Sequence, residues 1–394
     1  MKVTFFANYL NPHTIHLCDA FYRILGDDFA FVASAEIDAE RKTLGWSDSE
    51  KAPYEIRIGE SPESRDKAKQ LANESDAIIH GSAPLEYVGD AIKHGKLVFR
   101  HFERINKKGR WTLLLPPRLL SVLRRYVVYG KKNVFVLCAS AYTAGDFALL
   151  NAYRGRMYKW GYFFESGKTN IEGLFRKKDN EVVEILWEGR FIWWKHPEKA
   201  LHVARQLKEN GHRFELKMIG IGEKESTVKR LIEKHNLPDC VKMLGAMPPE
   251  KVREHMERAN IYLFTSNYHE GWGAVLNEAM ICGCAVVASH AAGSTPYLIK
   301  HGKNGLVYRS WDKKDLYEQV RTLMDDKDLR ERLGKAACVT LTQEWDAETA
   351  AERFLQLCEK KMEDAYYAGE TGSGPCSVAE PIPQGRVYSV LVKD

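Results

Sequence analysis

The feature that most constrains the fold of this chain is a regular alternation of short apolar runs with longer amphipathic stretches. Such runs are typical of strands buried on both faces of a parallel sheet, and the stretches between them are typical of covering helices. In the first half we expect strands at 3–7, 29–33, 77–80, 97–100 and 134–138, and helices at 14–25, 64–74, 85–94, 119–129 and 142–153. In the second half we expect strands at 184–188, 215–219, 241–244, 261–265, 285–289 and 306–308, and helices near 197–210, 225–236, 249–258, 273–282 and 294–300.

The number of expected strands indicates more than one sheet. Roughly a dozen strands exceed one doubly wound sheet, and 394 residues exceed one ordinary core. We therefore predict an α/β protein of two Rossmann-like domains that face each other across a cleft, with ligands at the carboxyl ends of the strands. The predicted division is an N-terminal domain at 1–165, a polar linker at 166–180, a C-terminal domain at 181–345, a helix at 346–366 that crosses back to the N-terminal domain, and a tail at 367–394.

The predicted tail contains two stretches of different composition. Residues 369–375 have the composition of a flexible linker. The apolar run at 387–392 either pairs as an edge strand or stays loose, and a disordered tail is an equally good interpretation.

The polar loop after the expected strand at 261–265 is the most informative motif. Gly271 and Gly273 let the backbone approach a ligand closely, and the free N–H groups at the following helix start form an anion site suited to phosphate. Glu270 and Glu278 flank this site, and their carboxylates suit the vicinal hydroxyls of ribose and hexose. Taken alone, the two acids fit a capping and a surface role better. The glycine loop and the preceding strand favour ligand binding.

A second loop supplies positive charge. Gly189 and Arg190 follow the expected strand at 184–188, and Lys195 precedes Pro197, which can start a helix. Arg190 offers a fork to two phosphate oxygens and Lys195 offers a point charge, and a leaving diphosphate needs both. Two solvated surface cations are the competing interpretation for either residue alone.

Several spaced motifs occur in one order along the chain. They are Glu270-x7-Glu278, Gly189-Arg190-x4-Lys195, Gly220-Ile-Gly222 and the run from Gly283 to Tyr297. With this combination the chain resembles the retaining glycosyltransferases of family 4 (group 1), specifically over 181–365 and only in architecture over 1–165. The resemblance implies a GT-B fold. It also implies an enzyme that moves a hexose-type sugar from a UDP- or GDP-linked donor to a glycan or lipid-linked acceptor, with retention of configuration, in surface polysaccharide or glycoconjugate biosynthesis.

The resemblance also implies roles for individual residues. Arg190 and Lys195 would hold the donor diphosphate, and Glu278 would hold the ribose. The nucleotide sugar is then a substrate, no cofactor is needed, and basic residues with helix amides replace a catalytic metal. Trp272 stands where phenylalanine is common in the family, which is expected to reshape the sugar pocket. The expected donor-binding residues are Gly271, Trp272, Gly273, Ala274, Val275, Glu278, Gly222 and Gly245.

The first domain is expected to bind the acceptor. Relatives often place a histidine that touches the donor sugar after the strand that corresponds to 97–100. His101 stands there, and Glu103 could serve instead. A lone histidine is otherwise most often a structural or surface residue. The expected catalytic residues are Glu270, Arg190, Lys195 and His101, and the expected acceptor-side residues are Asn11, His13 and Glu103.

Positive charge is concentrated in one stretch of the first domain. Between residues 93 and 132 there are twelve Lys or Arg and one acid, Glu103, whereas the net charge of the whole chain is +5. Leu, Val and Trp are interleaved with Arg in 111–129, which favours a helix lying on an anionic membrane surface. A domain helix with a solvated basic face is the competing interpretation. Nucleic acid is a weaker partner, because no nucleic-acid motif accompanies the charge.

Composition bears on the compartment and on rival functions. No apolar run reaches the roughly 18 residues of a membrane span, and no secretory leader is evident. The cysteines fit buried thiols better than a zinc site, so we expect a cytoplasmic protein without metal, peripheral at the inner face of the membrane. A nucleotide-sugar epimerase of similar fold and a non-catalytic nucleotide-sugar-binding partner protein remain as alternatives. The full set of cations and acids argues against the partner protein, and the basic apolar stretch argues against the epimerase.

Overall fold

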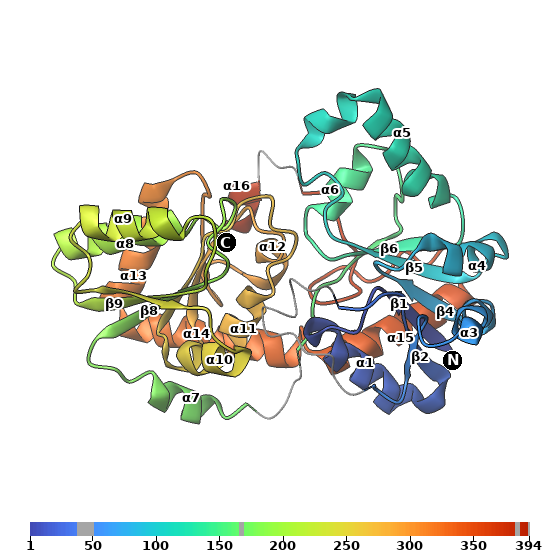
Figure 1. The fold of residues 1–394 in the computed structure, drawn as a ribbon, viewed down its shortest axis with the longest axis horizontal. Coiled ribbons are helices and arrows are strands. Elements are labelled where there is room, and N and C mark those ends of the chain that lie inside the picture. Colours follow the sequence, from blue (N-terminus) through green and yellow to red (C-terminus); the bar gives the residue numbers. More distant parts are fainter. Residues whose placement is uncertain (38–50, 165–168, 383–386, 393–394) are drawn as a thin grey trace. The chain divides into compact units, whose positions relative to one another are not determined.

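The computed structural model describes residues 1–37, 51–164, 169–382 and 387–392. Within these ranges the chain divides into two compact units, the first formed by Met1–Glu165 with Trp345–Ile382 and the second by Ser166–Glu344 with Pro383–Asp394. Figure 1 shows strands and covering helices in each of them. Each unit has a parallel sheet and a hydrophobic core of its own, as expected of a Rossmann-like domain.

The first unit is built on a parallel sheet with strand order β3-β2-β1-β4-β5-β6-β7. Because β1 pairs with β2 on one side and β4 on the other, the strand order reverses between β1 and β4. Its strands are β1 Val3–Ala7, β2 Phe29–Ala33, β3 Glu55–Arg57, β4 Ala77–His80, β5 Leu97–Phe102, β6 Val134–Cys138 and β7 Met157–Lys159. Its helices are α1 Pro12–Leu25, η1 Gly26–Asp28, α3 Pro62–Glu74, η2 Leu85–Tyr87, α4 Gly89–Lys93, η3 Arg110–Leu114, α5 Pro116–Arg125, η4 Val127–Tyr129, α6 Thr143–Ala148 and α15 Ala347–Glu363.

The second unit repeats this topology with strand order β10-β9-β8-β11-β12-β13, and the order reverses between β8 and β11. Its strands are β8 Val183–Glu188, β9 Phe214–Ile219, β10 Val241–Gly245, β11 Ile261–Phe264, β12 Ala285–Ser289 and β13 Leu306–Tyr308. Its helices are α7 Ile171–Lys177, α8 Pro197–Glu209, α9 Glu225–Lys234, α10 Pro249–Arg258, α11 Val275–Ile281, α12 Thr295–Leu298, α13 Lys313–Asp325, α14 Lys327–Gln343 and α16 Val387–Leu391.

Local sequence explains where several helices begin. The side chain of Asn11 accepts a backbone N–H at the start of α1. Asp312, Asp326 and Asp346 do the same for α13, α14 and α15. These short polar side chains satisfy N–H groups that a helix start leaves unbonded, so each boundary is set by its own sequence.

The predicted strands are present, with ends displaced by no more than two residues, but several elements were missed. β3 and β7 have only three residues each, too few for a recognisable apolar run. The prediction also omitted α13 and α14. The helices expected at 119–129 and 142–153 are shorter, as α5 and α6, and η4 follows α5.

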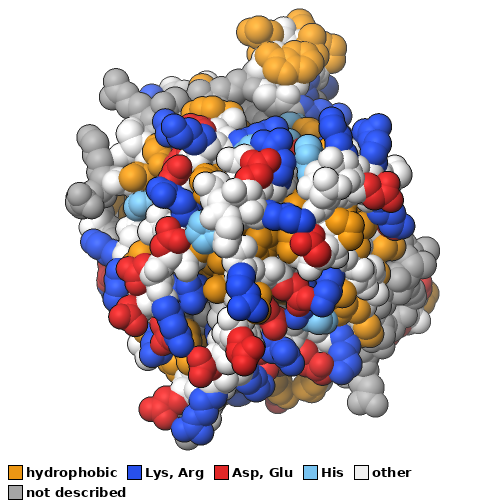
Figure 2. Space-filling view, turned by 90° about the vertical axis from the view of Figure 1, so that its left-hand side faces the viewer, with side chains coloured by type: hydrophobic (Ala, Val, Ile, Leu, Met, Phe, Trp, Pro, Cys, Tyr) orange, Lys and Arg blue, Asp and Glu red, His pale blue; other side chains and the backbone are white. Residues whose placement is uncertain are grey.

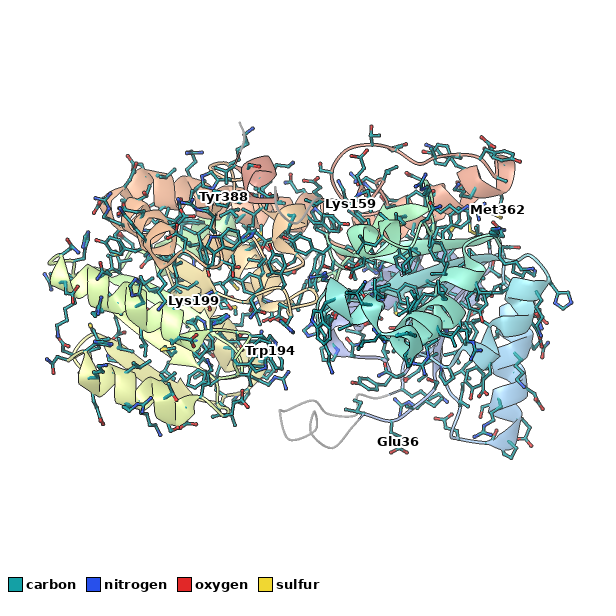
Figure 3. The ribbon with its side chains drawn as sticks, turned by 90° about the horizontal axis from the view of Figure 1, so that it is seen from above. Glu36, Lys159, Trp194, Lys199, Met362 and Tyr388 are labelled. Atoms are coloured by element: carbon teal, nitrogen blue, oxygen red, sulfur yellow. The ribbon has the colours of Figure 1, made fainter. Side chains whose placement is uncertain are left out.

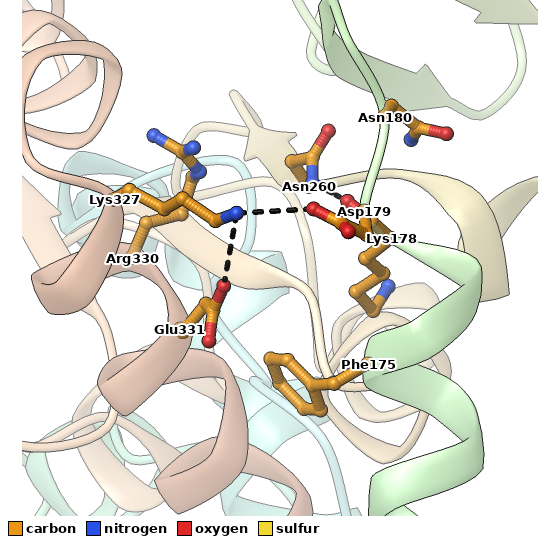
Figure 4. A pocket seen from close by; sticks show the side chains of 9 residues that line it. Phe175, Lys178, Asp179, Asn180, Asn260, Lys327, Arg330 and Glu331 are labelled. Carbon is orange, nitrogen blue, oxygen red and sulfur yellow. Dashed lines mark hydrogen bonds and ion pairs between the residues drawn. The ribbon is translucent and has the colours of Figure 1, made fainter.

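The predicted linker at 166–180 contains α7, so the prediction was wrong over 169–180; residues 165–168 lie outside the described residues. Beyond α7, the Nζ of Lys178 donates to the carbonyl oxygens of Met256 at 2.9 Å and Ala259 at 2.6 Å. Figure 4 shows Phe175 and Lys178 beside a cavity of about 40 Å³. Because Leu174 alone among the residues of α7 is buried, the stretch looks polar in sequence although it packs against the second unit.

α15 belongs to the first unit although the second unit separates it from α1 in sequence. The ring of Phe354 lies 5.6 Å from Phe21, 4.9 Å from Phe99 and 5.9 Å from Trp160, measured between centroids. Figure 1 shows α15 next to α1. The helix expected at 346–366 therefore completes the core of the first unit.

The interpretation of 369–382 as a flexible linker or disordered tail was wrong. Val378 pairs with Tyr158 as an antiparallel bridge beside β7, and Ala379 is buried in the core of the first unit. The backbone N–H of Cys376 donates to the carbonyl of Lys159 at 2.9 Å. Glycine-rich composition suggested flexibility, but these contacts hold the segment against the sheet.

The run at 387–392 forms α16, so the prediction of an edge strand or a loose segment was also wrong. Tyr388, labelled in Figure 3, covers the guanidinium of Arg309 at 5.2 Å and lies 6.1 Å from the ring of His290. This packing on the second unit decides the conformation of a short run with no strong preference of its own. Residues 383–386 and 393–394 of the predicted tail lie outside the described residues.

Candidate functional site

The two informative loops of the second unit meet at the point where its strand order reverses. β8 and β11 are neighbours and pair at Ile185 with Ile261 and at Leu186 with Tyr262. Beyond this pairing the strands lead into separate loops, and in sheets of this type ligands bind in the crevice between such loops at the carboxyl edge. The loops are tied together, because the N–H of Asn267 donates to the carbonyl of Trp194 at 2.9 Å. Figure 3 shows Trp194 in the loop after β8.

Three glycines allow the loops after β8 and β9 to press against each other. A Cβ at Gly220 would lie 2.1 Å from the carbonyl oxygen of Gly189, and one at Gly222 would lie 2.7 Å from that of Phe191. All three glycines have positive φ angles, +150° at Gly189, +129° at Gly220 and +153° at Gly222. The predicted donor residue Gly222 thus shapes the backbone beside the crevice. Gly245 ends β10 and accepts the N–H of Gly220 at 2.8 Å.

Lys195 and Glu270 form an ion pair in the crevice. The Nζ of Lys195 lies 3.0 Å from Oε2 of Glu270, and the two side chains are only 13% and 14% exposed. Ser266 donates a hydrogen bond to the same Oε2 at 3.0 Å. The hydroxyl of Thr265 donates to the backbone carbonyl of Lys195 at 2.6 Å. Two residues predicted from separate motifs are therefore in direct contact, at a place where water screens their attraction weakly.

A third acid, Glu188, was missed in the sequence. It ends β8, and among the described residues no hydrogen-bond partner reaches its buried Oε2 atom. Burial raises the pKa of Glu188 to about 6; Lys195 opposes this shift and Glu270 adds to it. The available signal was an acid that follows the apolar run 185–187 and directly precedes the glycine of the Gly189-Arg190 motif.

Glu278 completes the group of carboxylates. It lies in the first turn of α11, and burial raises its pKa to about 8. Repulsion from Glu188 adds to this shift, whereas Lys195 and Arg253 oppose it. Glu278 is therefore mainly protonated at neutral pH, so its carboxyl can donate a hydrogen bond as well as accept one.

Arg190 lies in the same loop as Lys195 but is exposed. Its guanidinium carbon lies 5.8 Å from the ring centroid of Trp194, which orients the side chain along the loop. The structure thus provides one enclosed and one accessible cation beside the crevice.

The expectation that Trp272 contacts a donor does not fit the structure. Its side chain is fully buried, and its indole N–H donates to Oδ1 of Asn277 at 2.9 Å. The hydroxyl of Ser294 donates to the carbonyl of Trp272 at 2.7 Å. Because the ring has no exposed surface, Trp272 supports the loop from within.

The rest of the glycine loop is only partly accessible. Gly271 is also buried, whereas Gly273, Ala274 and Val275 are half-buried where α11 begins. Gly273 has a φ of +89°, and a Cβ there would lie 2.4 Å from the ring of Phe264. This glycine is therefore required for packing against β11.

The residues predicted in the first unit gather around Tyr162, which the sequence analysis missed. The ring of Tyr162 lies 5.8 Å from His13 and 6.0 Å from His101, and its hydroxyl donates to Oε1 of Glu103 at 3.0 Å. Burial lowers the pKa of His101 to about 4, so this ring is neutral. Lys107 forms an ion pair with Glu103.

Asn11 caps α1, which gives it a structural role. Tyr162 carries no sequence signal, because it lies in an irregular segment after β7.

Neither a metal-binding cluster nor a membrane-spanning helix is present within the described ranges. In these ranges no three His, Cys, Asp or Glu side chains are grouped so that they could hold a metal ion. No helix described there is both long and apolar enough to span a bilayer.

Comparison with known proteins finds a family model that matches most of the second unit. Residues 172–338 match the family model described as glycosyl transferases group 1. The second unit is therefore similar to group 1 glycosyltransferases over this range, and we call it the group 1 domain after the match. The match contains the Lys195 and Glu270 loops and α11, so the group 1 domain carries the whole carboxylate cluster.

Two curated relatives match part of this chain. The amylovoran biosynthesis glycosyltransferase AmsK of Erwinia amylovora is 35% identical over 157 residues, which are 39% of this chain and 38% of AmsK. The D-inositol 3-phosphate glycosyltransferase of Corynebacterium jeikeium is 30% identical over 190 residues, 46% of this chain and 44% of the relative. The matched regions thus span less than half the length of either relative.

Solved structures resemble the chain over most of its length. Anabaena HepE in complex with UDP has a TM-score of 0.67 at 18% identity, covering 91% of this chain and all of HepE. Sucrose-phosphate synthase of Thermosynechococcus elongatus has a TM-score of 0.65 at 14% identity, covering 92% and 99%. At such identities the likeness concerns the fold, and it confirms the predicted GT-B fold of two Rossmann-like domains.

Proposed function

We propose that this chain is a retaining glycosyltransferase. It takes a hexose-type sugar from a UDP- or GDP-linked donor and passes it to a glycan or lipid-linked acceptor in surface polysaccharide assembly, in the cytoplasm at the inner face of a membrane. The observation that carries the proposal is the enclosed Lys195–Glu270 ion pair, which lies among further carboxylates at the switch point of a group 1 domain. The naming of AmsK for amylovoran biosynthesis and the complexes of HepE with UDP and UDP-glucose support the same class of reaction.

The donor diphosphate is proposed to replace Glu270 as the ion-pair partner of Lys195. A diphosphate carries more negative charge than one carboxylate and attracts the ammonium group more strongly. The exposed Arg190 on the same loop supplies a fork to the second phosphate. Glu270, still bonded to Ser266, then accepts hydrogen bonds from hydroxyls of the donor sugar. The ion pair thus holds both side chains in place until the donor arrives.

Glu278 is proposed to hold the ribose. A neutral carboxyl donates one hydrogen bond and accepts another, which matches two vicinal hydroxyls. Burial and the neighbouring Glu188 keep the Glu278 carboxyl neutral by raising its pKa to about 8. Glu188 therefore acts on the donor site through the protonation of its neighbour.

The proposed transfer needs no side-chain nucleophile. The bond between the anomeric carbon and the phosphate oxygen breaks, and Lys195 and Arg190 stabilise the charge that develops on the diphosphate. The acceptor hydroxyl attacks from the same face, and its proton passes to the departing phosphate oxygen, so the configuration is retained. These cations take the place of a metal ion, and we expect turnover to persist in a chelator.

The group around Tyr162 is proposed as the acceptor side. Neutral His101 and the Tyr162 hydroxyl can each donate or accept a hydrogen bond, and Glu103 can accept one, which suits a polyhydroxylated acceptor.

A thermal-shift panel of UDP, GDP, ADP, UMP, UDP-glucose and GDP-mannose tests the donor proposal. We expect one diphosphate series to raise the melting temperature and the monophosphate to have a smaller effect, because a ligand stabilises the folded state in proportion to its affinity. The shift should be lost in Lys195→Ala and kept in Lys208→Ala, since Lys208 lies near the opposite end of α8. Equal shifts in both variants, or none from any diphosphate, would refute the assignment. Conversion of the donor into its epimer without an acceptor would instead identify an epimerase.

A further inference from the structure

The first unit carries a concentrated exposed apolar surface on η3, α5 and η4. Six of the fourteen large hydrophobic side chains that are exposed in the described ranges lie between residues 111 and 128, and each is between 37% and 83% exposed. We call them the apolar ridge: Trp111, Leu114, Leu115, Leu120, Leu123 and Val128. The other eight are scattered along the chain, as is normal for surface residues. Six exposed large hydrophobic side chains within residues 111–128 are the pattern of an interaction surface.

The ridge is held by contacts on its inner side. Val122 lies on the inner face of α5 and is fully buried, and it is the only buried residue of that helix. Arg118 donates to the carbonyl of Ile105 at 2.9 Å, and Arg100 donates to that of Arg125 at 2.9 Å. The segment therefore has a defined position while its outer apolar side chains face water.

The cations of this region divide into two groups. Arg100 and Arg104 are buried, and Arg104 forms an ion pair with Asp146 at 2.9 Å, so they belong to the interior. Nearer the ridge the sequence from 105 to 133 has eight Lys or Arg and no Asp or Glu. Among those whose side chains the structure describes, the exposed cations are Lys108, Arg124, Arg125, Lys131 and Lys132.

The second unit shows a different surface. Figure 2, which faces that unit, shows Lys and Arg interspersed with Asp and Glu and no extended region of one sign. The surface of the second unit thus mixes both signs of charge, whereas the sequence around the apolar ridge carries cations without acids.

The chemistry of the ridge selects one kind of partner. The phosphates of a nucleic acid would pair with the cations, but Trp111 and Leu114 would stay exposed to water. A protein partner would have to bring both an apolar face and a matching set of acids. An anionic bilayer offers lipid phosphates at the level of its headgroups and an apolar layer directly below, which matches cations flanking a row of Leu and Trp side chains.

We propose that η3, α5 and η4 dock on an anionic lipid surface. The apolar ridge enters the boundary between headgroups and acyl chains, and Arg124, Arg125, Lys131 and Lys132 lie against lipid phosphates. This docking does not depend on the proposed donor chemistry, because all of its residues lie in the first unit. It would hold the Tyr162 group of the same unit near acceptors carried by the membrane.

Vesicle sedimentation of the full-length protein at about 0.1 M salt tests the proposal. We expect pelleting with vesicles of phosphatidylcholine and phosphatidylglycerol (7:3) and little pelleting with phosphatidylcholine alone. Arg124→Gln combined with Arg125→Gln should weaken partitioning about tenfold or more, since each cation near the surface is worth about 1 kcal/mol. Lys313→Gln with Lys314→Gln, an exposed pair on the second unit, is the matched control and should bind like the wild type.

The apolar contribution is tested by Trp111→Ser with Leu114→Ser, against Trp311→Ser on the second unit, where the exposed fraction of Trp311 is 69%. The double variant should lose anionic-vesicle binding, and the control should keep it. Equal melting temperatures would show that the variants are folded. Brominated lipids should quench the wild type more than Trp111→Phe, because Trp111 enters the bilayer.

Several results would overturn the proposal. They are equal binding to neutral and anionic vesicles, binding of the ridge variants at wild-type strength, tighter binding to RNA than to vesicles, or a dimer that dissociates when the ridge is changed. None of these results bears on the donor panel, so the two proposals fail separately.

Discussion

At the scale of single residues, the charge balance of the candidate site depends on Lys195. Its ammonium group lies 3.0 Å from Glu270 and also lowers the pKa of Glu188 and Glu278. Three carboxylates share one enclosed ammonium group, so negative charge is in excess and Glu278 retains its proton near neutrality. A diphosphate that draws Lys195 away changes this balance, and donor binding is therefore coupled to proton binding.

Lys195→Ala should lower kcat/KM for donor turnover by about 100-fold or more, because it removes the enclosed cation from the departing diphosphate. Steady-state kinetics with the donor found in the panel measure this loss. Lys208→Ala, which removes an ion pair with Asp239 at 2.7 Å near the other end of α8, should keep its activity. Unchanged turnover in a folded Lys195→Ala protein would contradict the role of Lys195.

Glu278→Gln should stabilise the protein increasingly as the pH rises. The pKa of Glu278 in the folded protein is about 8, above its ordinary value of 4.5, so the stability it contributes is full below pH 4.5 and is lost as the pH rises through 8. Glutamine does not ionise, so the stability of the variant does not fall with pH for this reason. Melting temperatures from pH 5 to pH 8.5 should therefore diverge in favour of the variant, and a constant difference would argue against a buried proton on Glu278.

At the scale of elements, the site is made by loops that close packing holds in place. Gly189, Gly220 and Gly222 bring the loops after β8 and β9 into contact, and the buried Trp272 anchors the loop before α11. Neither set needs to touch a ligand to be essential, because each sets the backbone from which Lys195 and Glu270 project.

Gly220→Ala should destabilise the second unit by about 2–4 kcal/mol, because its Cβ would lie 2.1 Å from the carbonyl oxygen of Gly189 and its φ is +129°. Gly211→Ala is the matched control: its φ is +78°, and nothing lies within 4 Å of the added Cβ. The control should lose only about 1 kcal/mol, the cost of the backbone conformation. Urea unfolding measures both losses, and equal values would show that the loop contact is unimportant.

At the scale of the whole molecule, the first unit is assembled from two distant parts of the chain. Residues 1–165 supply its sheet, and Trp345–Ile382 supplies α15 and the segment beside β7. The group 1 domain is inserted between these parts, so the first unit is complete only when the C-terminal part has folded back onto it.

Phe354→Ala should destabilise the first unit by about 3–5 kcal/mol, the usual loss when a buried phenylalanine is truncated. Its ring lies against Phe21, Phe99 and Trp160. Tyr366→Ala, which removes a side chain from a residue that is 95% exposed, should change the unfolding free energy by less than about 0.5 kcal/mol. Chemical denaturation followed by circular dichroism compares the two. A small effect at Phe354 would mean that α15 is dispensable.

Much of the fold could be predicted because its causes are local. Apolar runs of four or five residues specify most of the buried parallel strands, and each such run is visible in a short window of sequence. The spacing of Lys195 and Glu270 after two such strands was also visible in sequence. The direct contact between these two residues followed once β8 and β11 became neighbours.

Other features depend on contacts between residues far apart in sequence. Sequence gave no sign that Trp272 turns inward to Asn277, that Glu188 joins the carboxylates, or that Tyr162 joins His13, His101 and Glu103. Sequence by itself determined the α/β class, the two sheets and the loops that carry charge, because each follows from the chemistry of adjacent residues. Only the tertiary structure decided which side chains are buried, which acids keep their protons and which unit receives α15, because burial and electrostatic coupling arise when separate strands and helices pack together.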